Sequence, residues 1–126
     1  MTKILIKSVI PFAKYENVIY SYKIKGLLSN GEEISILDEV PINVEGYINQ
    51  YVQLELSSYF ISEKGKDANY CFVGKVKYHQ EINQYYFENE FIKILLPIDC
   101  VKNSDIKINK TGKYCFEELV LKQILL

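Results

Sequence analysis

The chain has 126 residues, of which 48% are hydrophobic, and a formal net charge of −1 at pH 7. Such a length suits a single domain, here residues 1–126, that buries one core without metals or disulfides, and the composition excludes a disordered chain. The charge excludes the large positive field typical of duplex-binding proteins. Because every basic residue is Lys, no side chain can make the two-pronged contact by which Arg reads guanine.

The apolar runs are too short to predict a membrane span. The longest are Ile94–Ile98 and Ile124–Leu126, whereas a spanning helix needs about 20 apolar residues. The first apolar stretch contains Lys3 and lacks the small-residue cleavage site of a signal peptide. We therefore expect a cytoplasmic protein that does not contact membranes.

Alternation of apolar and polar residues is the dominant pattern, and it predicts strands. A first strand is expected over residues 3–10. A second, over 18–28, turns at Asn30-Gly31 into a third over 33–40, because Asn-Gly supplies the positive backbone φ angles of a tight hairpin. The residues of the second strand expected to face the core are Val18, Tyr20, Tyr22, Ile24 and Leu28.

The middle of the chain predicts one long strand and one surface loop. Residues 41–49 fit either a linker or a bulged entry into a strand. Residues 50–61 alternate as a strand, with Phe60 on its apolar side. Residues 62–69 contain Lys64-Gly65-Lys66-Asp67 and predict an exposed loop.

The second half of the chain shows the same alternation of apolar and polar residues. Residues 70–79 predict a strand, residues 80–84 a turn, and residues 85–96 a returning strand that is broken near Glu88-Asn89-Glu90. Residues 114–126 fit two interpretations, a short helix or a strand buried on both faces, and we favour the strand.

About seven strands without a long helical period predict an antiparallel all-β protein. We expect a small closed or nearly closed barrel, because open sheet edges invite aggregation. The strand pattern is similar to that of OB-fold and SH3-like small barrels. Residues 18–61 laid on residues 72–125 match in their hairpin strands and in the proline that follows them. This suggests two hairpin-plus-strand repeats, although Ile- and Lys-rich strands resemble one another without common origin.

Few residues are suited to catalysis. His79 is the single histidine, and it lies eight residues from Cys71 on one face of the predicted strand, about 26 Å away at ~3.3 Å per residue, so these two cannot form a dyad there. The three cysteines, an odd number without C-x-x-C spacing, argue against a disulfide framework and a structural zinc site. We expect Cys71, Cys100 and Cys115 to be core or half-buried residues.

Acidic pairs such as Glu32-Glu33 and Glu117-Glu118 lie beside turns, where they are typical of a solvated sheet surface. The six glycines are scattered and form no phosphate-binding loop, and no nucleophile-elbow or zinc-protease motif is present. We therefore expect a protein that is not an enzyme and that uses no cofactor and no metal.

Aromatic residues and lysines are the remaining candidates for a binding site. Eleven Tyr and six Phe exceed what a core of this size needs, and Tyr is enriched at protein interfaces and stacks on unpaired bases. The tyrosines predicted on exposed faces are Tyr51, Tyr59 and one of Tyr85 or Tyr86. The lysines predicted on the outer faces, which form one stripe if the two strands are neighbours, are Lys23, Lys25, Lys75 and Lys77. A plainer explanation is that Tyr favours strands and Lys keeps them soluble.

Two functions follow from this pattern. The first is a non-catalytic barrel that binds another protein, as an inhibitor, adaptor or accessory subunit. The alternative is an OB-like protein that binds single-stranded DNA or RNA through the lysine stripe and its tyrosines. The near-zero charge favours the first, and the barrel pattern favours the second.

Overall fold

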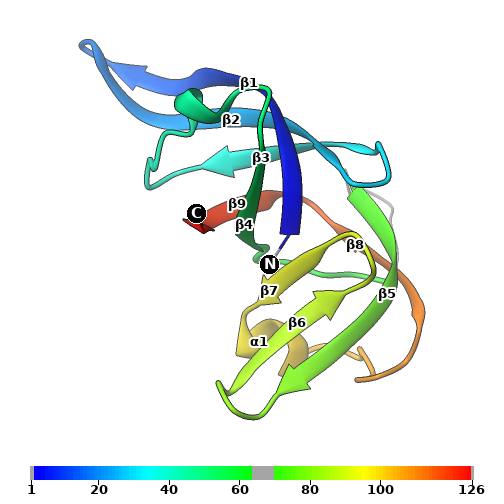
Figure 1. The fold of residues 1–126 in the computed structure, drawn as a ribbon. Helices are drawn as coiled ribbons and strands as arrows, with labels where there is room; N and C mark the ends of the chain where they lie inside the picture. The colour runs from blue at the N-terminus through cyan, green and yellow to red at the C-terminus, as the bar shows by residue number, and fades with distance from the viewer. Residues whose placement is uncertain (1, 64–69, 126) are drawn as a thin grey trace.

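The chain folds into a five-stranded β-barrel that carries an additional sheet, and 59% of the residues are in strands (Figure 1). The structure is a computed structural model that describes residues 2–63 and 70–125. It confirms the prediction of a small all-β barrel. The described residues form nine strands rather than about seven, because one predicted strand is a hairpin and the C-terminal segment contains two strands.

The barrel consists of β1 (Thr2–Tyr15), β2 (Val18–Leu28), β3 (Glu33–Asp38), β4 (Tyr51–Ser57) and β9 (Leu119–Leu125). The strands follow the order β1-β2-β3-β9-β4, and an antiparallel pairing of β1 with β4 closes the barrel. Strand β9 runs parallel to β3 and antiparallel to β4. This connectivity resembles the five-stranded Greek-key barrel of the OB type.

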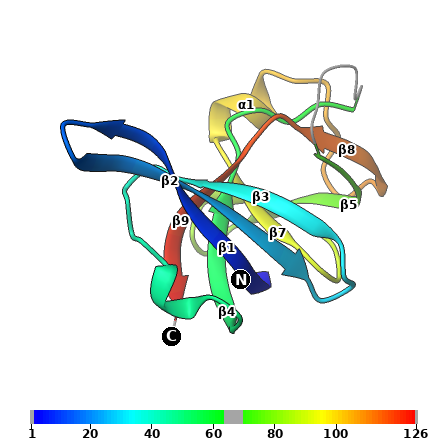
Figure 2. The same ribbon diagram turned by 90° about the horizontal axis from the view of Figure 1, so that it is seen from above.

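The second sheet is inserted between β4 and β9. It contains β5 (Tyr70–His79), β6 (Gln84–Glu88), β7 (Lys93–Leu96) and β8 (Gly112–Phe116), in the order β7-β6-β5-β8. Strand β7 pairs with β4 in parallel and so joins this sheet to the barrel wall. A short helix, α1 (Ile98–Lys102), packs against β6, and Figure 2 shows it on the same side of the molecule as β8.

One continuous cluster of apolar side chains fills both parts. In the barrel it takes alternate residues of each strand, such as Ile24 of β2 and Leu54 of β4, as the period-two pattern predicts. In the second sheet the rings of Phe72, Phe87 and Phe116 contact one another, and the centroids of Phe87 and Phe116 are 5.2 Å apart. The core thus spans the junction between barrel and sheet.

The first two strands are longer than the sequence predicts. Strand β1 continues from residue 10 to Tyr15 and forms a hairpin with β2 through Glu16 and Asn17, whose φ angles are 48° and 69°. Positive φ at both central residues is the geometry of the tight turn that favours hairpins. The predicted core positions Val18 and Tyr20 are therefore wrong, because they lie on this hairpin beyond the barrel, and both are exposed.

Two further predicted segments need correction. Strand β4 ends at Ser57, so Phe60 follows the strand and is exposed instead of buried. The predicted broken strand over 85–96 is a hairpin of β6 and β7, in which Asn89 accepts hydrogen bonds from the backbone N–H groups of Phe91 and Ile92.

The pairing pattern does not reproduce a duplicated unit. In the first half, β2 pairs directly with β3. The segments matched to them in the second half are β5 and β7, and these do not pair with each other, because β6 lies between them and pairs with both. The suggested repeat between residues 18–61 and 72–125 therefore has no counterpart in the strand pairing.

The two segments for which the sequence allowed alternative structures each have one structure. Residues 112–116 and 119–125 form strands β8 and β9, in agreement with the favoured interpretation. Residues 41–49 form a linker that contains the 3-10 turn η1 (Glu45–Tyr47). Residues 64–69 of the predicted surface loop lie outside the described residues.

The three cysteines are core or half-buried residues, as predicted, but two of them are paired, which the prediction did not expect. Cys71 of β5 and Cys115 of β8 lie directly opposite each other in the antiparallel register, and a disulfide joins them. Cys100 has a free thiol and is half-buried. The odd number of cysteines does not exclude a disulfide here, because a count carries no information about which strands become neighbours.

Candidate functional site

The most distinctive surface is the end of the β1–β2 hairpin, which we call the arm and define as residues 10–21. Figures 1 and 2 show it extending away from the barrel. Strand β4 pairs with β1 only up to Leu5, and β3 pairs with β2 only from Tyr22 onward. Within the described residues, the arm is therefore a two-stranded ribbon without a third strand on either edge.

Large apolar side chains of the arm are exposed to solvent. Phe12 is 60% exposed and Tyr15 is 65% exposed, and Ile10, Val18 and Tyr20 are each more than half exposed. These five are nearly a third of the sixteen large apolar residues that are exposed in the described ranges. Because single exposed apolar residues are ordinary but such a concentration on one ribbon is not, the arm is a candidate contact site.

The arm and the strand residues at its base together carry a net positive charge. Residues 7–23 contain Lys7, Lys14 and Lys23 against the single acid Glu16. The Lys23 ammonium lies 5.0 Å from the centroid of the Phe12 ring, a cation–π contact that holds the ring over the base of the arm. In the described part of the chain, none of the three lysines forms an ion pair.

The four predicted lysines do not form one stripe. Lys23 and Lys25 lie on β2, whereas Lys75 and Lys77 lie on β5, and β3, β9, β4, β7 and β6 separate these strands in the sheet order. Lys25 is 3.9 Å from Glu33 and Lys77 is 4.0 Å from Glu88. Half of the expected positive charge is thus already offset by neighbouring carboxylates.

The predicted tyrosines fall into two groups. Tyr51 and Tyr59 are exposed, and each has a lysine ammonium over its ring, from Lys3 and Lys122 respectively. Neither Tyr85 nor Tyr86 is exposed, so the expectation that one of them faces solvent is wrong.

The burial of these two residues has different causes. The Tyr85 ring packs against Tyr78, with 4.9 Å between centroids. Tyr86 is covered by Lys93, whose ammonium lies 4.4 Å from the ring centroid, and by His79.

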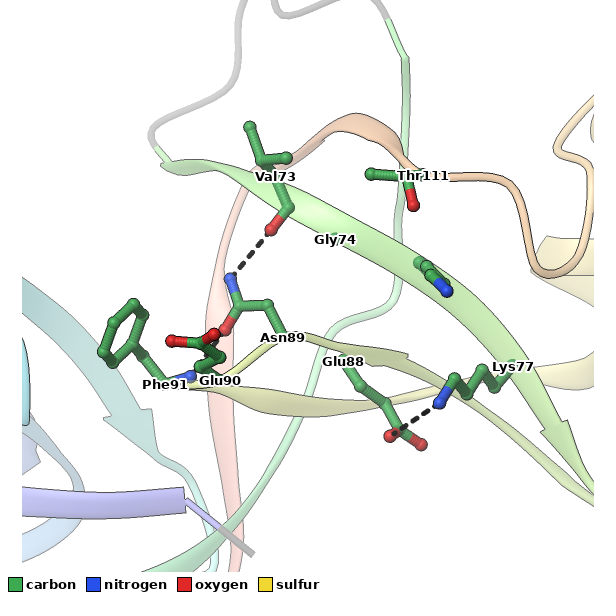
Figure 3. A pocket seen from close by; sticks show the side chains of 9 residues that line it. Val73, Gly74, Lys77, Glu88, Asn89, Glu90, Phe91 and Thr111 are labelled. Carbon is green, nitrogen blue, oxygen red and sulfur yellow. Dashed lines mark hydrogen bonds and ion pairs between the residues drawn. The ribbon is translucent and has the colours of Figure 1, made fainter.

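Lys75 and Lys77 do line a common groove of about 510 Å³ beside β5 and the β6–β7 turn. Figure 3 shows Asn89 reaching across it to donate a hydrogen bond to the Val73 carbonyl, and Lys77 directed toward Glu88. Glu88 and Glu90 also line the groove. Two lysines against two glutamates provide no excess positive charge for an anionic backbone.

His79 has partners that account for its position. Its Nε2 lies in hydrogen-bonding contact with Oε1 of Glu88, and its ring stands edge-on to Tyr86. Burial raises the pKa of the Tyr86 hydroxyl, and the carboxylates of Glu55 and Glu88 raise it further. Among the described residues, no cluster of three or more His, Cys, Asp or Glu side chains could hold a metal ion.

Sequence reasoning missed the arm. The signal was present as apolar residues at Ile10 and Phe12 beyond the predicted strand, and as Asn17, a residue type that tolerates positive φ. It was missed because Glu-Asn is a weaker hairpin signal than Asn-Gly.

Comparison of the chain with family models, curated proteins and solved structures gave no match. None of the helices in residues 2–63 and 70–125 is long and apolar enough to cross a membrane.

Proposed function

We propose that this chain is a non-catalytic binding module that holds another protein through its arm. The observation that supports this function is the concentration of exposed Phe12, Tyr15 and Tyr20, with Ile10 and Val18, on a ribbon outside the core. Aromatic residues carry most binding energy in protein interfaces because they bury a large area at a small entropic cost. The barrel serves as a rigid base for the ribbon.

The partner surface is apolar and acidic. Apolar surface matches Phe12 and Tyr15, and carboxylates match Lys14 on the arm and Lys7 at its base. The unpaired backbone edges of the arm also suit addition of an extended partner strand, a common mode of peptide recognition.

A photo-crosslinking residue in place of Phe12 tests this function in the host cell. We expect one discrete adduct with another protein. The matched control replaces Ile82, an equally exposed apolar residue in the turn between β5 and β6. Adducts that are the same from both positions, or none from position 12, would contradict the proposal.

A double substitution, Phe12→Ser with Tyr15→Ser, separates binding from folding. Because both side chains are exposed, the free energy of unfolding should change by less than about 0.5 kcal/mol. The adduct formed from a third arm position, Tyr20, should nevertheless disappear. Urea denaturation followed by circular dichroism checks the first expectation, and denaturing electrophoresis checks the second.

The second candidate function is binding of single-stranded nucleic acid. The observation that favours it is the combination of lysines with Phe12 and Tyr20 on the arm of an OB-like barrel, since such barrels hold strands by stacking bases on aromatic rings. Phosphate contacts from Lys14 on the arm and from Lys7 and Lys23 at its base would give a slope of log affinity against log salt of roughly −2, against about −3 for the four lysines that the sequence predicts. Oligo-dT titrations at several salt concentrations measure this slope, and undetectable binding at low salt would remove this candidate.

The cytoplasmic location expected from the sequence remains a prediction. The disulfide between Cys71 and Cys115 argues against a strongly reducing compartment, since protein disulfides persist mainly under oxidising conditions.

A further inference from the structure

We propose that a cavity on the outer side of the barrel wall binds a small organic anion that has a flat apolar body. The cavity has a volume of about 260 Å³ and lies where β4 of the barrel meets β7 of the second sheet. It is smaller than the ~300–1,000 Å³ of pockets that hold drug-sized ligands, so its occupant is small. This site is separate from the arm and does not depend on the function proposed above.

Among residues 2–63 and 70–125, Lys122 is the only charged residue that lines the cavity. It extends from β9, and its ammonium lies 5.8 Å from the centroid of the Tyr59 ring. Within the described ranges it forms no ion pair. A fixed positive charge without a carboxylate partner favours an anion at this position.

The uncommitted polar groups of the lining are hydrogen-bond donors. The side-chain oxygen of Gln84 accepts a hydrogen bond from the Tyr86 hydroxyl, and that of Asn83 accepts one from the Tyr78 hydroxyl. Each amide therefore keeps its NH₂ group for another partner. Donors without acceptors again match an anionic group.

Ser57 adds a buried hydroxyl. Val52, Leu54 and Leu56 of β4 face the barrel core, so alternation turns Ser57 to the outer side, where it lines the cavity. It is only 4% exposed, and its Oγ is the one buried side-chain polar atom of the described residues without a hydrogen-bond partner. Since an unpaired buried hydroxyl is unfavourable, a ligand acceptor that pairs with it gains affinity.

Strand β7 and the residues after it give the cavity an apolar wall, in which Leu95 lies beside Ser57 in the register of β4 and β7. Leu95 and Leu96 of β7, followed by Pro97 and Ile98, form this wall, and the Tyr59 ring stands at the exposed rim. An aromatic or similarly flat body fits between this wall and the ring, with its anionic group directed toward Lys122. Tyr59 is among the binding residues that the sequence predicts, and its ring lies beside the Lys122 ammonium.

Calorimetric titration of the intact protein with benzoate, indole-3-carboxylate and phenyl phosphate tests the site. We expect saturable one-to-one binding of at least one of them. Comparison of the two carboxylates with the phosphate identifies the preferred head group. Benzyl alcohol, which lacks the charge, and acetate, which lacks the body, should bind at least about tenfold more weakly.

Two substitutions locate the binding. Lys122→Met keeps the apolar stem and should weaken the preferred anion about tenfold, whereas the matched control Lys3→Met, another lysine over a tyrosine ring, should leave its affinity unchanged. Ser57→Ala should weaken binding without lowering the midpoint of thermal unfolding. No saturable binding of any of the three anions, or equal affinity in Lys122→Met and the wild type, would overturn the proposal.

Discussion

At the scale of single residues, Gly74 is a position that leaves no room for a side chain. It lies in the middle of β5 and is buried against β6. A Cβ atom there would stand 2.7 Å from Cζ of Phe87 and closer still to the backbone carbonyl of Glu88. Both neighbours belong to the adjacent strand, so neither can move without disturbing the sheet.

Gly74→Ala should therefore lower the free energy of unfolding by about 1–3 kcal/mol, the usual effect of overpacking. Gly46→Ala is the matched control, because a Cβ atom at Gly46 meets nothing within 4 Å. It should change stability by less than about 0.5 kcal/mol. Urea denaturation measures both values, and equal effects of the two substitutions would contradict this account.

The raised pKa of the Tyr86 hydroxyl predicts how the free energy of unfolding changes with pH in the alkaline range. Its pKa is raised by burial and by Glu55 and Glu88, so the folded state resists ionisation at a pH where the unfolded chain ionises. The sign follows from linkage: the stability is fully present below the unfolded pKa of about 10 and is lost as pH rises above it.

Tyr86→Phe should reduce this loss, leaving the part due to Tyr114, whose pKa is also raised by burial. Unfolding curves between pH 8 and 11 measure the difference. Tyr51→Phe, at an exposed ring, should retain the full alkaline loss. The same alkaline loss in Tyr86→Phe and the wild type would contradict the assignment to this hydroxyl.

At the scale of elements, the linker after β3 depends on one buried carboxylate. Asp38 is fully buried, and its two oxygens accept hydrogen bonds from the backbone N–H groups of Ile42 and Asn43, each at 2.8 Å. Asp38→Asn replaces one acceptor by an NH₂ group that faces an N–H donor. We expect a loss of roughly 1–3 kcal/mol in the free energy of unfolding.

The neighbouring substitution Glu39→Gln removes the same charge from an exposed side chain and serves as the control. It should leave the unfolding midpoint in urea nearly unchanged. If both variants lose the same stability, the effect comes from net charge and not from the two hydrogen bonds.

At the scale of the whole molecule, the disulfide ties the start of β5 to β8 across a sequence separation of 44 residues. Closing a loop of this length reduces the entropy of the unfolded chain, which corresponds to a stabilisation of about 4 kcal/mol in the chain-entropy treatment. Reductant should therefore lower the unfolding midpoint markedly.

Reductant should not change the unfolding midpoint of a variant that carries both Cys71→Ala and Cys115→Ala. It should lower the midpoint of Cys100→Ala as it does that of the wild type. A wild-type midpoint that does not move in reductant, with three titratable thiols before its addition, would contradict the disulfide.

Most of the local structure was predictable because it depends on neighbouring residues. Alternation identified the strands and the inward side chains Tyr22, Ile24 and Leu54. Asn30-Gly31 correctly predicted the β2–β3 hairpin, in which Gly31 but not Asn30 has a positive φ. Alternation gave the wrong burial for Val18 and Tyr20, because the apolar and polar residues of a strand continue to alternate where the strand extends beyond the core. Of the predicted binding residues, exposed Tyr51 and Tyr59 were recognisable, whereas the burial of Tyr86 depends on Lys93 and His79 from other strands.

Residue alternation along the chain is enough to specify an all-β protein with a core built from every second residue. The folded molecule alone reveals that β1 pairs with β4, that β3 lies beside β9, and that Cys71 is opposite Cys115. The physical reason is range: side-chain alternation acts over two residues, whereas strand partners tens of residues apart are selected by the packing of the whole core. The arm and the cavity beside Lys122 are consequences of that selection.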